Sequence, residues 1–212
     1  MKENQVEDRL KFERQLWSEG YARVMGLDEV GRGCLAGPVV AAGVVFKPET
    51  DIPEIRDSKS INEKSRLLLA EQIKEEALFW TVQEGSIDEI NELNILWASL
   101  HTMQKCVDAA SLPPDYLLVD GNRYINSLIP YTCLVKGDDR SMSIAAASIL
   151  AKVYRDELMR DLHEEFPEYG WNSNVGYPAP VHKKALKEYG YTDHHRTTFK
   201  LGTNKKRVNI TS

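Results

Sequence analysis

The sequence lacks the patterns of several protein classes. It has three cysteines, Cys34, Cys106 and Cys133, an odd number without a CxxC pair, so neither a disulfide framework nor a zinc knuckle is indicated. No apolar run approaches the roughly 20 residues that span a bilayer. The N-terminus MKENQVEDRLKFERQLW is too charged for a secretory signal. We therefore expect a cytoplasmic protein with reduced thiols and no membrane contact.

Common catalytic signatures are also missing. There is no Walker A loop, no GxSxG elbow and no HExxH, which removes the commonest nucleotide-hydrolase, serine-hydrolase and zinc-protease patterns. Internal repeats and low-complexity segments are absent as well. With 212 residues, the chain is long enough for one sizeable core, and a monomer is the default expectation.

Charge is unevenly distributed along the chain. The net charge is −5, but residues 181–212 hold eight Lys or Arg against two acidic residues, a net +6, which leaves −11 for the rest. A basic end on an acidic body fits a protein that grips a phosphate backbone at one place and holds cations at another. A solvated tail fits equally well, so contact of the tail with DNA stays open.

The chain is organised around the stretch from Met25 to Phe46, MGLDEVGRGCLAGPVVAAGVVF. It predicts a strand, an acidic tip with Asp28 and Glu29, a glycine turn and a return strand. Adjacent strand residues point to opposite faces, so both carboxylates can serve one site only if the strand ends or bends there. The alternative is an ordinary acidic hairpin tip with a solvated arginine.

Two further apolar runs end in carboxylates beside a glycine. Residues 115–122 read DYLLVDGN and deliver Asp120, and the run from Tyr131 to Val135 leads to Asp138 and Asp139 beyond Gly137. Strand ends of this kind meet at one edge of a sheet. In chain order, a further strand is expected between the first hairpin and these two runs, from Leu78 to Glu84.

Helical patterns separate these strands. We expect a short N-terminal helix within residues 3–20, a helix after a cap at Ser60 or Asn62 with an apolar stripe through Leu67, Ala70, Ile73 and Ala77, and a helical segment over 87–110 broken near Asn94. The longest pattern covers 141–166, and a short basic helix covers 182–189.

Four carboxylates at one spot repel one another and raise their own pKa values, so such a cluster normally holds divalent cations. For Asp28, Glu29, Asp120 and Asp138, Mg²⁺ or Mn²⁺ is the natural occupant. Two such ions roughly 4 Å apart can activate a water and stabilise the leaving oxygen of a phosphoryl displacement. The set predicts a nuclease or phosphotransferase, and Asp139 competes with Asp138 as a ligand.

Other candidate residues have ordinary explanations. Adjacent histidines such as His194 and His195 in a polar tail are usually solvated or contact phosphate. Tyr177 and Trp171 could stack on a base or sugar, although aromatic residues in a Gly/Pro loop more often anchor packing. Lys59, in a loop, could meet a phosphate.

Seven segments together carry a resemblance to a known family. They are GLDEVGRG (26–33), DSKSIN (57–62), VDGN (119–122), VKGD (135–138), SIAAASILAKVYRD (143–156), and the NVGYP and HHR elements near Tyr177 and His195. In order and spacing, over about residues 23–200, they resemble ribonuclease HII.

The resemblance implies an α/β ribonuclease H-like fold, with a central mixed five-stranded sheet flanked by helices. It divides the chain into an N-terminal helical segment (1–22), the catalytic core (23–166), a small C-terminal helical part completing the substrate groove (167–200) and a basic tail (201–212).

By this similarity the enzyme hydrolyses RNA in RNA/DNA hybrids. It also incises DNA duplexes 5′ of a single embedded ribonucleotide, leaving 3′-hydroxyl and 5′-phosphate ends, as in ribonucleotide excision repair and RNA primer removal. The resemblance assigns metal binding by two ions to Asp28, Glu29, Asp120 and Asp138. It assigns 2′-hydroxyl sensing to the Gly31-Arg32-Gly33 backbone and junction sensing to Tyr177. Further substrate contacts fall on three residues: Lys59, Asn122 and Ser143.

The glycine turn agrees with this assignment, because the 2′-hydroxyl distinguishes RNA from DNA and a glycine backbone can approach it without side-chain interference. The alternatives are a ribonuclease HIII-like enzyme, from which a large N-terminal domain and a Gly-Lys-Gly turn would be expected, a non-catalytic hybrid-binding module, and a general metal-dependent phosphatase.

Overall fold

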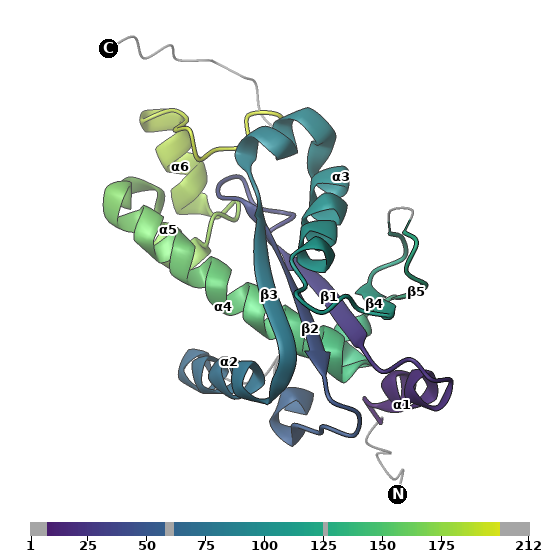
Figure 1. Ribbon diagram of the computed structural model, residues 1–212. Helices are drawn as coiled ribbons and strands as arrows, with labels where there is room; N and C mark the ends of the chain where they lie inside the picture. Colours follow the sequence, from purple (N-terminus) through teal and green to yellow (C-terminus); the bar gives the residue numbers. More distant parts are fainter. Residues whose placement is uncertain (1–7, 58–61, 125–126, 200–212) are drawn as a thin grey trace, which may run out of the picture.

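The computed structural model describes residues 8–57, 62–124 and 127–199. Its centre is a five-stranded sheet in the order β3-β2-β1-β4-β5 (Figure 1). β1 is antiparallel to β2 and parallel to β4, β2 is antiparallel to β3, and β4 is parallel to β5. The predicted mixed five-stranded sheet is therefore confirmed. The strands span Val24–Val30 (β1), Val39–Phe46 (β2), Ala77–Gly85 (β3), Tyr116–Asp120 (β4) and Tyr131–Leu134 (β5).

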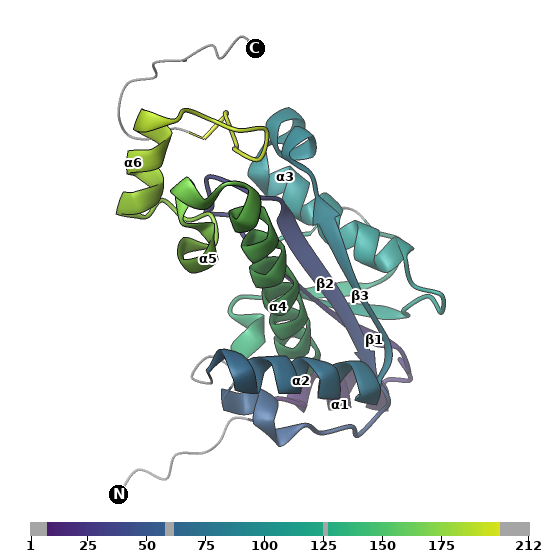
Figure 2. The same ribbon diagram turned by 90° about the vertical axis from the view of Figure 1, so that its left-hand side faces the viewer.

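Helices cover both faces of the sheet (Figure 2). α4 and α2 pack on one face and α3 on the other, so β2, between them, is buried at every position. This burial explains why its sequence is a continuous apolar run and not an alternating one. The helices span Lys11–Ser18 (α1), Glu63–Glu76 (α2), Ile87–Asp108 (α3), Met142–Glu165 (α4), Trp171–Asn174 (α5) and Pro180–Glu188 (α6).

Several local predictions are confirmed. Asn62 caps α2 by accepting a hydrogen bond from the Ser65 backbone N–H at 2.9 Å. α3 is broken at Asn94, whose φ of 66° is not helical. The predicted stripe of α2 is partly wrong, because Leu67 is 40% exposed and Ala77 already belongs to β3. Leu69 takes the buried place instead, beside Ala70 and Ile73.

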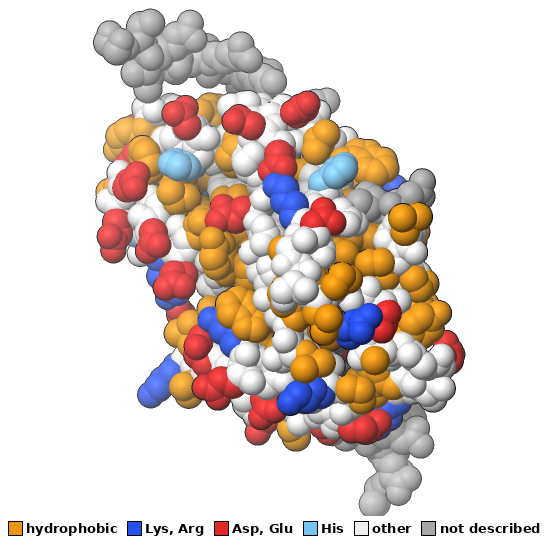
Figure 3. Space-filling model, viewed as in Figure 1, with side chains coloured by type: hydrophobic (Ala, Val, Ile, Leu, Met, Phe, Trp, Pro, Cys, Tyr) orange, Lys and Arg blue, Asp and Glu red, His pale blue; other side chains and the backbone are white. Residues whose placement is uncertain are grey.

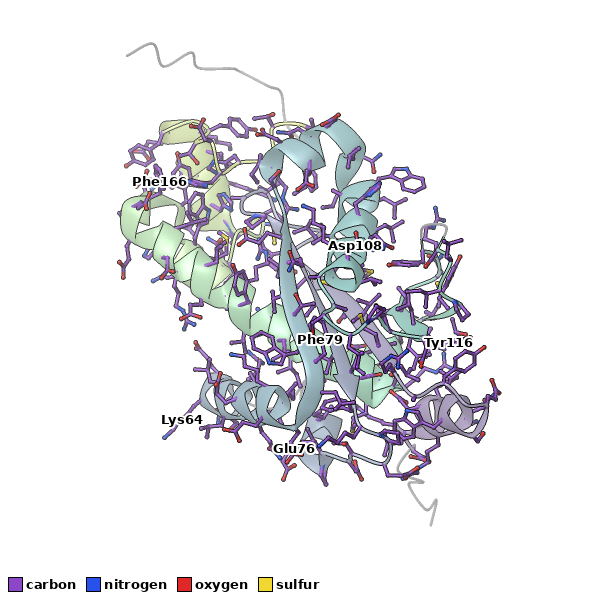
Figure 4. All side chains as sticks on the ribbon, viewed as in Figure 1. Lys64, Glu76, Phe79, Asp108, Tyr116 and Phe166 are labelled. Carbon is purple, nitrogen blue, oxygen red and sulfur yellow. The ribbon has the colours of Figure 1, made fainter. Side chains whose placement is uncertain are left out.

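The C-terminal part packs on the far end of α4, where Phe166 is labelled in Figure 4. Apart from the apolar residues that pack on the two faces of the sheet, a separate apolar cluster joins Leu35 and Met159 to Trp171 and Leu186 from the C-terminal part. His195 lies within it and is 1% exposed, so the expectation of a solvated histidine is wrong for this residue. On the face shown in Figure 3, acidic, basic and hydrophobic side chains are interspersed.

None of the helices in the described ranges has the length and apolar character needed to cross a membrane.

Candidate active site

The sheet topology brings the predicted carboxylates to one edge. β1, β4 and β5 run parallel and side by side, so their C-terminal ends lie together. Asp28 and Glu29 are near the end of β1, and Asp120 is the last residue of β4. Asp138 lies in the 3₁₀ turn η2, Gly137–Asp139, just after β5. These residues come from three segments that are far apart in the sequence.

The expectation that β1 ends or bends at its two carboxylates is half right. The parallel pairing with β4 stops at Leu27, opposite Val119, whereas the antiparallel pairing with β2 continues to Val30. β1 therefore stays paired with β2 to its end, whereas its other edge is no longer paired with β4 from Asp28 onward. Asp28 and Glu29 lie in this unpaired part, where they face the end of β4.

Asp28 is the most deeply buried of the four carboxylates, at 7% exposed. Burial raises its pKa well above the usual value, and the charges of Glu29 and Asp120 raise that pKa further. Two hydrogen bonds act in the opposite direction, one from the Ser148 side chain and one from the Glu29 backbone N–H at 2.7 Å. The site thus holds a carboxylate whose negative charge is incompletely compensated.

The other carboxylates are coupled to it. Burial also raises the pKa of Glu29, against the lowering effect of Arg32, whose Nη1 donates to Glu29 Oε1 at 2.9 Å. The pKa of Asp120 is raised by burial and by the charge of Asp138, and is lowered by backbone donors. Of these donors, the Gly137 N–H lies 2.6 Å from Asp120 Oδ1. All four side chains therefore belong to one electrostatic cluster.

The same interactions indicate which of the neighbouring residues Asp138 and Asp139 belongs to the cluster. Asp138 affects Asp120 through both its charge and its backbone N–H. Its own carbonyl accepts a hydrogen bond from Arg9 Nη1 at 3.1 Å, which places the turn against the N-terminal segment. These contacts favour Asp138 as the fourth member of the cluster.

The donor set fits a hard divalent cation. Carboxylate oxygens are the ligands that Mg²⁺ and Mn²⁺ prefer, and a bound cation would offset the repulsion that raises these pKa values. In the described part of the chain, no three His, Cys, Asp or Glu side chains already stand close enough to hold an ion. A cation would have to compete with the Arg32 guanidinium for the oxygen of Glu29.

The Gly-Arg-Gly turn lies next to this cluster on a base of two buried arginines. Arg155 and Arg196 are each 1% exposed. Arg155 donates to three carbonyl oxygens, those of Ala36 at 3.0 Å, Pro38 at 3.0 Å and Val175 at 2.8 Å. Carbonyl acceptors thus hold this guanidinium in place beneath the turn.

Arg196 supports the turn itself. Its Nη1 donates to the carbonyl oxygen of Arg32 at 3.1 Å and its Nε to that of Gly37 at 2.9 Å. In a trans peptide the C=O and the following N–H point in opposite directions. Because the Arg32 carbonyl points at Arg196, the Gly33 N–H points away from it, on a residue that is itself exposed.

The two glycines of the turn have different roles. Gly31 has a φ of +92°, and a Cβ built there would lie 2.3 Å from Arg155 Nε, so only glycine fits over the arginine. A Cβ on Gly33 would meet only Tyr177 Cε1, at an ordinary 3.5 Å. Gly31 is therefore required by the fold, while the outer side of Gly33 is open except for the tyrosine ring.

Tyr177 is 42% exposed beside Gly33, and its backbone is held from behind. His182 Nδ1 lies 2.9 Å from the Tyr177 carbonyl oxygen, and His182 Nε2 accepts from Trp171 Nε1 at 3.2 Å. His195 Nε2 lies 3.1 Å from the same His182 nitrogen, while Thr192 N–H donates to His195 Nδ1. This arrangement requires both histidines to be neutral, with His195 donating to His182.

The remaining predicted contacts have different outcomes. Asn122 is exposed two residues beyond Asp120, at the same edge of the sheet. Ser143 is 1% exposed and its hydroxyl donates to Glu13 Oε1 at 2.7 Å, which does not favour the predicted substrate contact. Lys59 and the tail at 201–212 lie outside the described residues.

Sequence reasoning missed three residues that contact the site or its support: Ser148, Arg155 and Arg196. Ser148 lies on the same helix as Ser143, and only the packing of α4 decides which hydroxyl reaches Asp28. The arginines bond to backbone carbonyls, so no acidic partner in the sequence indicates them.

Comparison with known proteins gives a consistent result. The family model described as Ribonuclease HII matches residues 25–202. The chain is similar to the ribonuclease HII of Salinibacter ruber, with 52% identity over 196 residues, which cover 91% of this chain and 98% of that protein.

Solved structures share the fold. The ribonuclease HII in the PCNA:RNase HII complex from Archaeoglobus fulgidus superposes with a TM-score of 0.71 at 26% identity, over 86% of this chain and 98% of that one. Bst-RNase HIII in complex with Mn²⁺ superposes with a TM-score of 0.62 at 22% identity, over 84% of this chain and 67% of that one, which shows a likeness of fold.

Proposed function

The chain belongs to the ribonuclease HII family and is thus an endonuclease of the ribonuclease H type, and from that premise we propose that its phosphodiester hydrolysis occurs at Asp28, Glu29, Asp120 and Asp138. The substrates are RNA/DNA hybrids and DNA duplexes with an embedded ribonucleotide, which is cut on its 5′ side. The observation that carries the proposal is the electrostatic coupling of these carboxylates at one edge of the sheet, where burial and neighbouring negative charge raise the pKa values of Asp28, Glu29 and Asp120.

The proposed cofactor is a pair of Mg²⁺ or Mn²⁺ ions. When bound, they supply an activated water and charge stabilisation for the leaving oxygen. Asp28, Glu29, Asp120 and Asp138 would hold them, and Arg32 would leave Glu29 for the phosphate backbone. An arginine suits this exchange, because its planar fork pairs with carboxylate and phosphate alike.

The proposed ribonucleotide sensor is the Gly31-Arg32-Gly33 backbone together with Tyr177. Arg196 holds the Arg32 carbonyl, so the Gly33 N–H is directed outward before substrate arrives. The 2′-hydroxyl is the group that tells RNA from DNA at one site. Tyr177 covers the outer side of Gly33, where it would meet the deoxyribose at the junction. In this proposal the C-terminal part, 167–200, completes the substrate groove.

The direct test is a DNA duplex that contains one ribonucleotide, incubated with Mg²⁺ beside an all-DNA control. We expect incision on the 5′ side of the ribonucleotide, with 3′-hydroxyl and 5′-phosphate ends. Cleavage of long hybrids alone would refute the sensor assignment. Cleavage of the all-DNA control would refute it as well.

A pair of variants separates sensing from folding. Gly33→Val should keep the melting temperature and lose incision at the single ribonucleotide, because its Cβ meets the Tyr177 ring at an ordinary 3.5 Å while the side chain takes up space where the sugar must approach. Gly31→Val is the matched control and should lose both, because its side chain collides with Arg155. Equal melting losses in the two variants would contradict this division.

A further inference from the structure

The N-terminal segment contacts the candidate active site, although it lies outside the 25–202 stretch that the family model matches. Helix α1 lies beside the start of α4 in both ribbon views (Figures 1 and 2). Three residues of this region carry the contact: Arg9, Glu13 and Ser141. Ser141 follows Asp138 by three residues and is the N-cap of α4.

The first backbone N–H groups of a helix need partners outside that helix. In α4, the Met142 N–H donates to the Arg9 carbonyl at 2.9 Å and the Ser143 N–H donates to Glu13 Oε1 at 3.0 Å. The Ile144 N–H reaches the Ser141 hydroxyl at 3.3 Å. Two of these three donors are therefore satisfied by the N-terminal segment and not by the core.

Glu13 is built into this junction. It is 2% exposed, and its Oε1 accepts from the Ser141 hydroxyl at 2.6 Å and the Ser143 hydroxyl at 2.7 Å in addition to the backbone N–H. A buried carboxylate is tolerated only with such donors, and the positive end of the helix dipole favours it further. Its loss would leave the buried Ser143 N–H without an acceptor and the two serine hydroxyls with only each other, 3.2 Å apart.

The segment also holds the turn that carries the fourth carboxylate. Arg9 Nη1 donates to the Asp138 carbonyl oxygen at 3.1 Å and to the Ile55 carbonyl oxygen at 3.1 Å. The Arg140 and Ser141 N–H groups in turn donate to the Gly137 carbonyl oxygen. The position of Asp138 is thus set by Arg9 on one side and by the turn's own bonds to the Gly137 carbonyl on the other.

The start of α4 is packed closely against the sheet. It lies directly on Gly26 of β1, where an added Cβ would come within 2.2 Å of the Ser143 carbonyl carbon. One turn further along α4, Ser148 bonds to Asp28. A displacement of the helix start would therefore move the partners of both Asp138 and Asp28.

We propose that Glu13, with Arg9, is a positioning residue of the active site, which fixes the α4 N-terminus and thereby the spacing between Asp138 and Asp28. The inference rests on the proposed metal-binding role of these two carboxylates. It assigns a functional contribution to a helix that the sequence presents only as packing on the body of the protein.

The test measures Mn²⁺ binding to the full chain by calorimetry, without nucleic acid. Glu13→Ala should weaken Mn²⁺ binding by about 10-fold or more, as losses of residues that orient metal ligands do. Glu13→Gln retains an acceptor oxygen for the three donors and should recover most of the affinity. Glu19→Ala, on an exposed site just after the same helix, is the matched control and should bind like the wild type.

Three outcomes decide the matter. A Glu13→Ala protein that melts earlier but binds Mn²⁺ normally would reduce Glu13 to a stabilising residue and overturn the proposal. If that variant fails to fold, Arg9→Met, which removes the bond to the Asp138 carbonyl, takes its place. We expect Arg9→Met to weaken Mn²⁺ binding by about 10-fold. Normal Mn²⁺ binding by Arg9→Met would overturn the proposal. Normal binding by Asp138→Asn would refute the metal role itself, a failure distinct from the others.

Discussion

The two halves of the candidate site treat buried charge in opposite ways. At the strand ends, the carboxylates raise one another's pKa values, and backbone N–H groups compensate only part of their charge. Below the Gly-Arg-Gly turn, Arg155 and Arg196 make five hydrogen bonds to carbonyl oxygens. The first region keeps negative charge that the chain itself does not compensate, whereas the second has most of its bonds in place, with Arg196 Nη2 buried and without a partner among the described residues. The proposed function needs both, because the enzyme would have to bind ions reversibly and recognise a sugar precisely.

This contrast predicts different costs of mutation. In the arginine-supported region, a substitution should lower stability along with activity. Among the carboxylates, a substitution should abolish activity and leave stability equal or improved, as is common where function requires a strained site.

The largest effect is expected for Arg155→Met. The buried carbonyls of Ala36 and Pro38 lose their donor, at about 1–3 kcal/mol each, and the Val175 carbonyl keeps only the weak donor Cys34 Sγ, so the free energy of unfolding should fall by at least about 3 kcal/mol. Urea unfolding measures it. Arg160→Met, on the same helix but in an exposed ion pair with Glu63, is the control and should change stability by less than about 1 kcal/mol. A small effect of Arg155→Met would end the distinction between the two regions.

Next in size is the effect of Asp120→Asn on catalysis. We expect cleavage of an RNA/DNA hybrid to fall by about 100-fold or more, which corresponds to about 2.7 kcal/mol of transition-state stabilisation. Asp108→Asn, on the exposed surface of α3, should cleave normally. Near-normal turnover of Asp120→Asn in Mg²⁺ would remove this carboxylate from the site.

A smaller effect of opposite sign is expected for Asp28→Asn without divalent cations. The amide keeps the acceptor for Ser148 and removes a charge that burial and Glu29 disfavour. The free energy of unfolding in EDTA should rise by about 0.5–2 kcal/mol, and the gain should shrink when Mg²⁺ is added. A loss of stability in EDTA would show that the carboxylates are satisfied without metal.

The last prediction concerns pH. Burial and then the charge of His182 lower the pKa of His195 from 6.5 to about 3. The stability from a neutral His195 is complete above pH 6.5 and is lost as the pH falls toward 3. The contribution of Asp28 to stability changes with pH in the opposite direction. Because the pKa of Asp28 is raised in the folded protein, stability falls as the pH rises through that raised pKa.

Urea unfolding of the metal-free protein from pH 6.5 downward can separate the two slopes. In His195→Asn, the free energy of unfolding should fall less steeply as the pH is lowered. In Asp28→Asn it should fall more steeply, because the opposing contribution of Asp28 is removed. Parallel curves for wild type and both variants would show that neither group titrates as described.

The sequence predicts the carboxylates better than their surroundings. Asp28, Glu29 and Asp120 could be identified because each follows an apolar run beside a glycine, a local pattern that survives folding. Asn94 was identified as a helix break for an equally local reason. These features depend on neighbouring residues alone.

The supporting residues could not be found this way. The partners of Arg155 are carbonyls more than a hundred positions away for two of its three bonds, and any residue can supply a carbonyl. The choice between Ser143 and Ser148 depends on how α4 lies on Gly26. Each is a consequence of tertiary packing, which single-sequence patterns do not encode.

The bond from Arg196 to the Arg32 carbonyl also bears on protein synthesis. It joins residues 164 positions apart, and the nearby backbone bond from Gly37 to His194 spans a similar distance. A ribosome makes the chain from the N-terminus, so the carboxylate-bearing strands emerge well before this arginine does. We expect the Gly-Arg-Gly turn of a nascent chain to lack this support until Arg196 has left the ribosome, so the carboxylate-bearing strands can form well before the turn beside them is held in place.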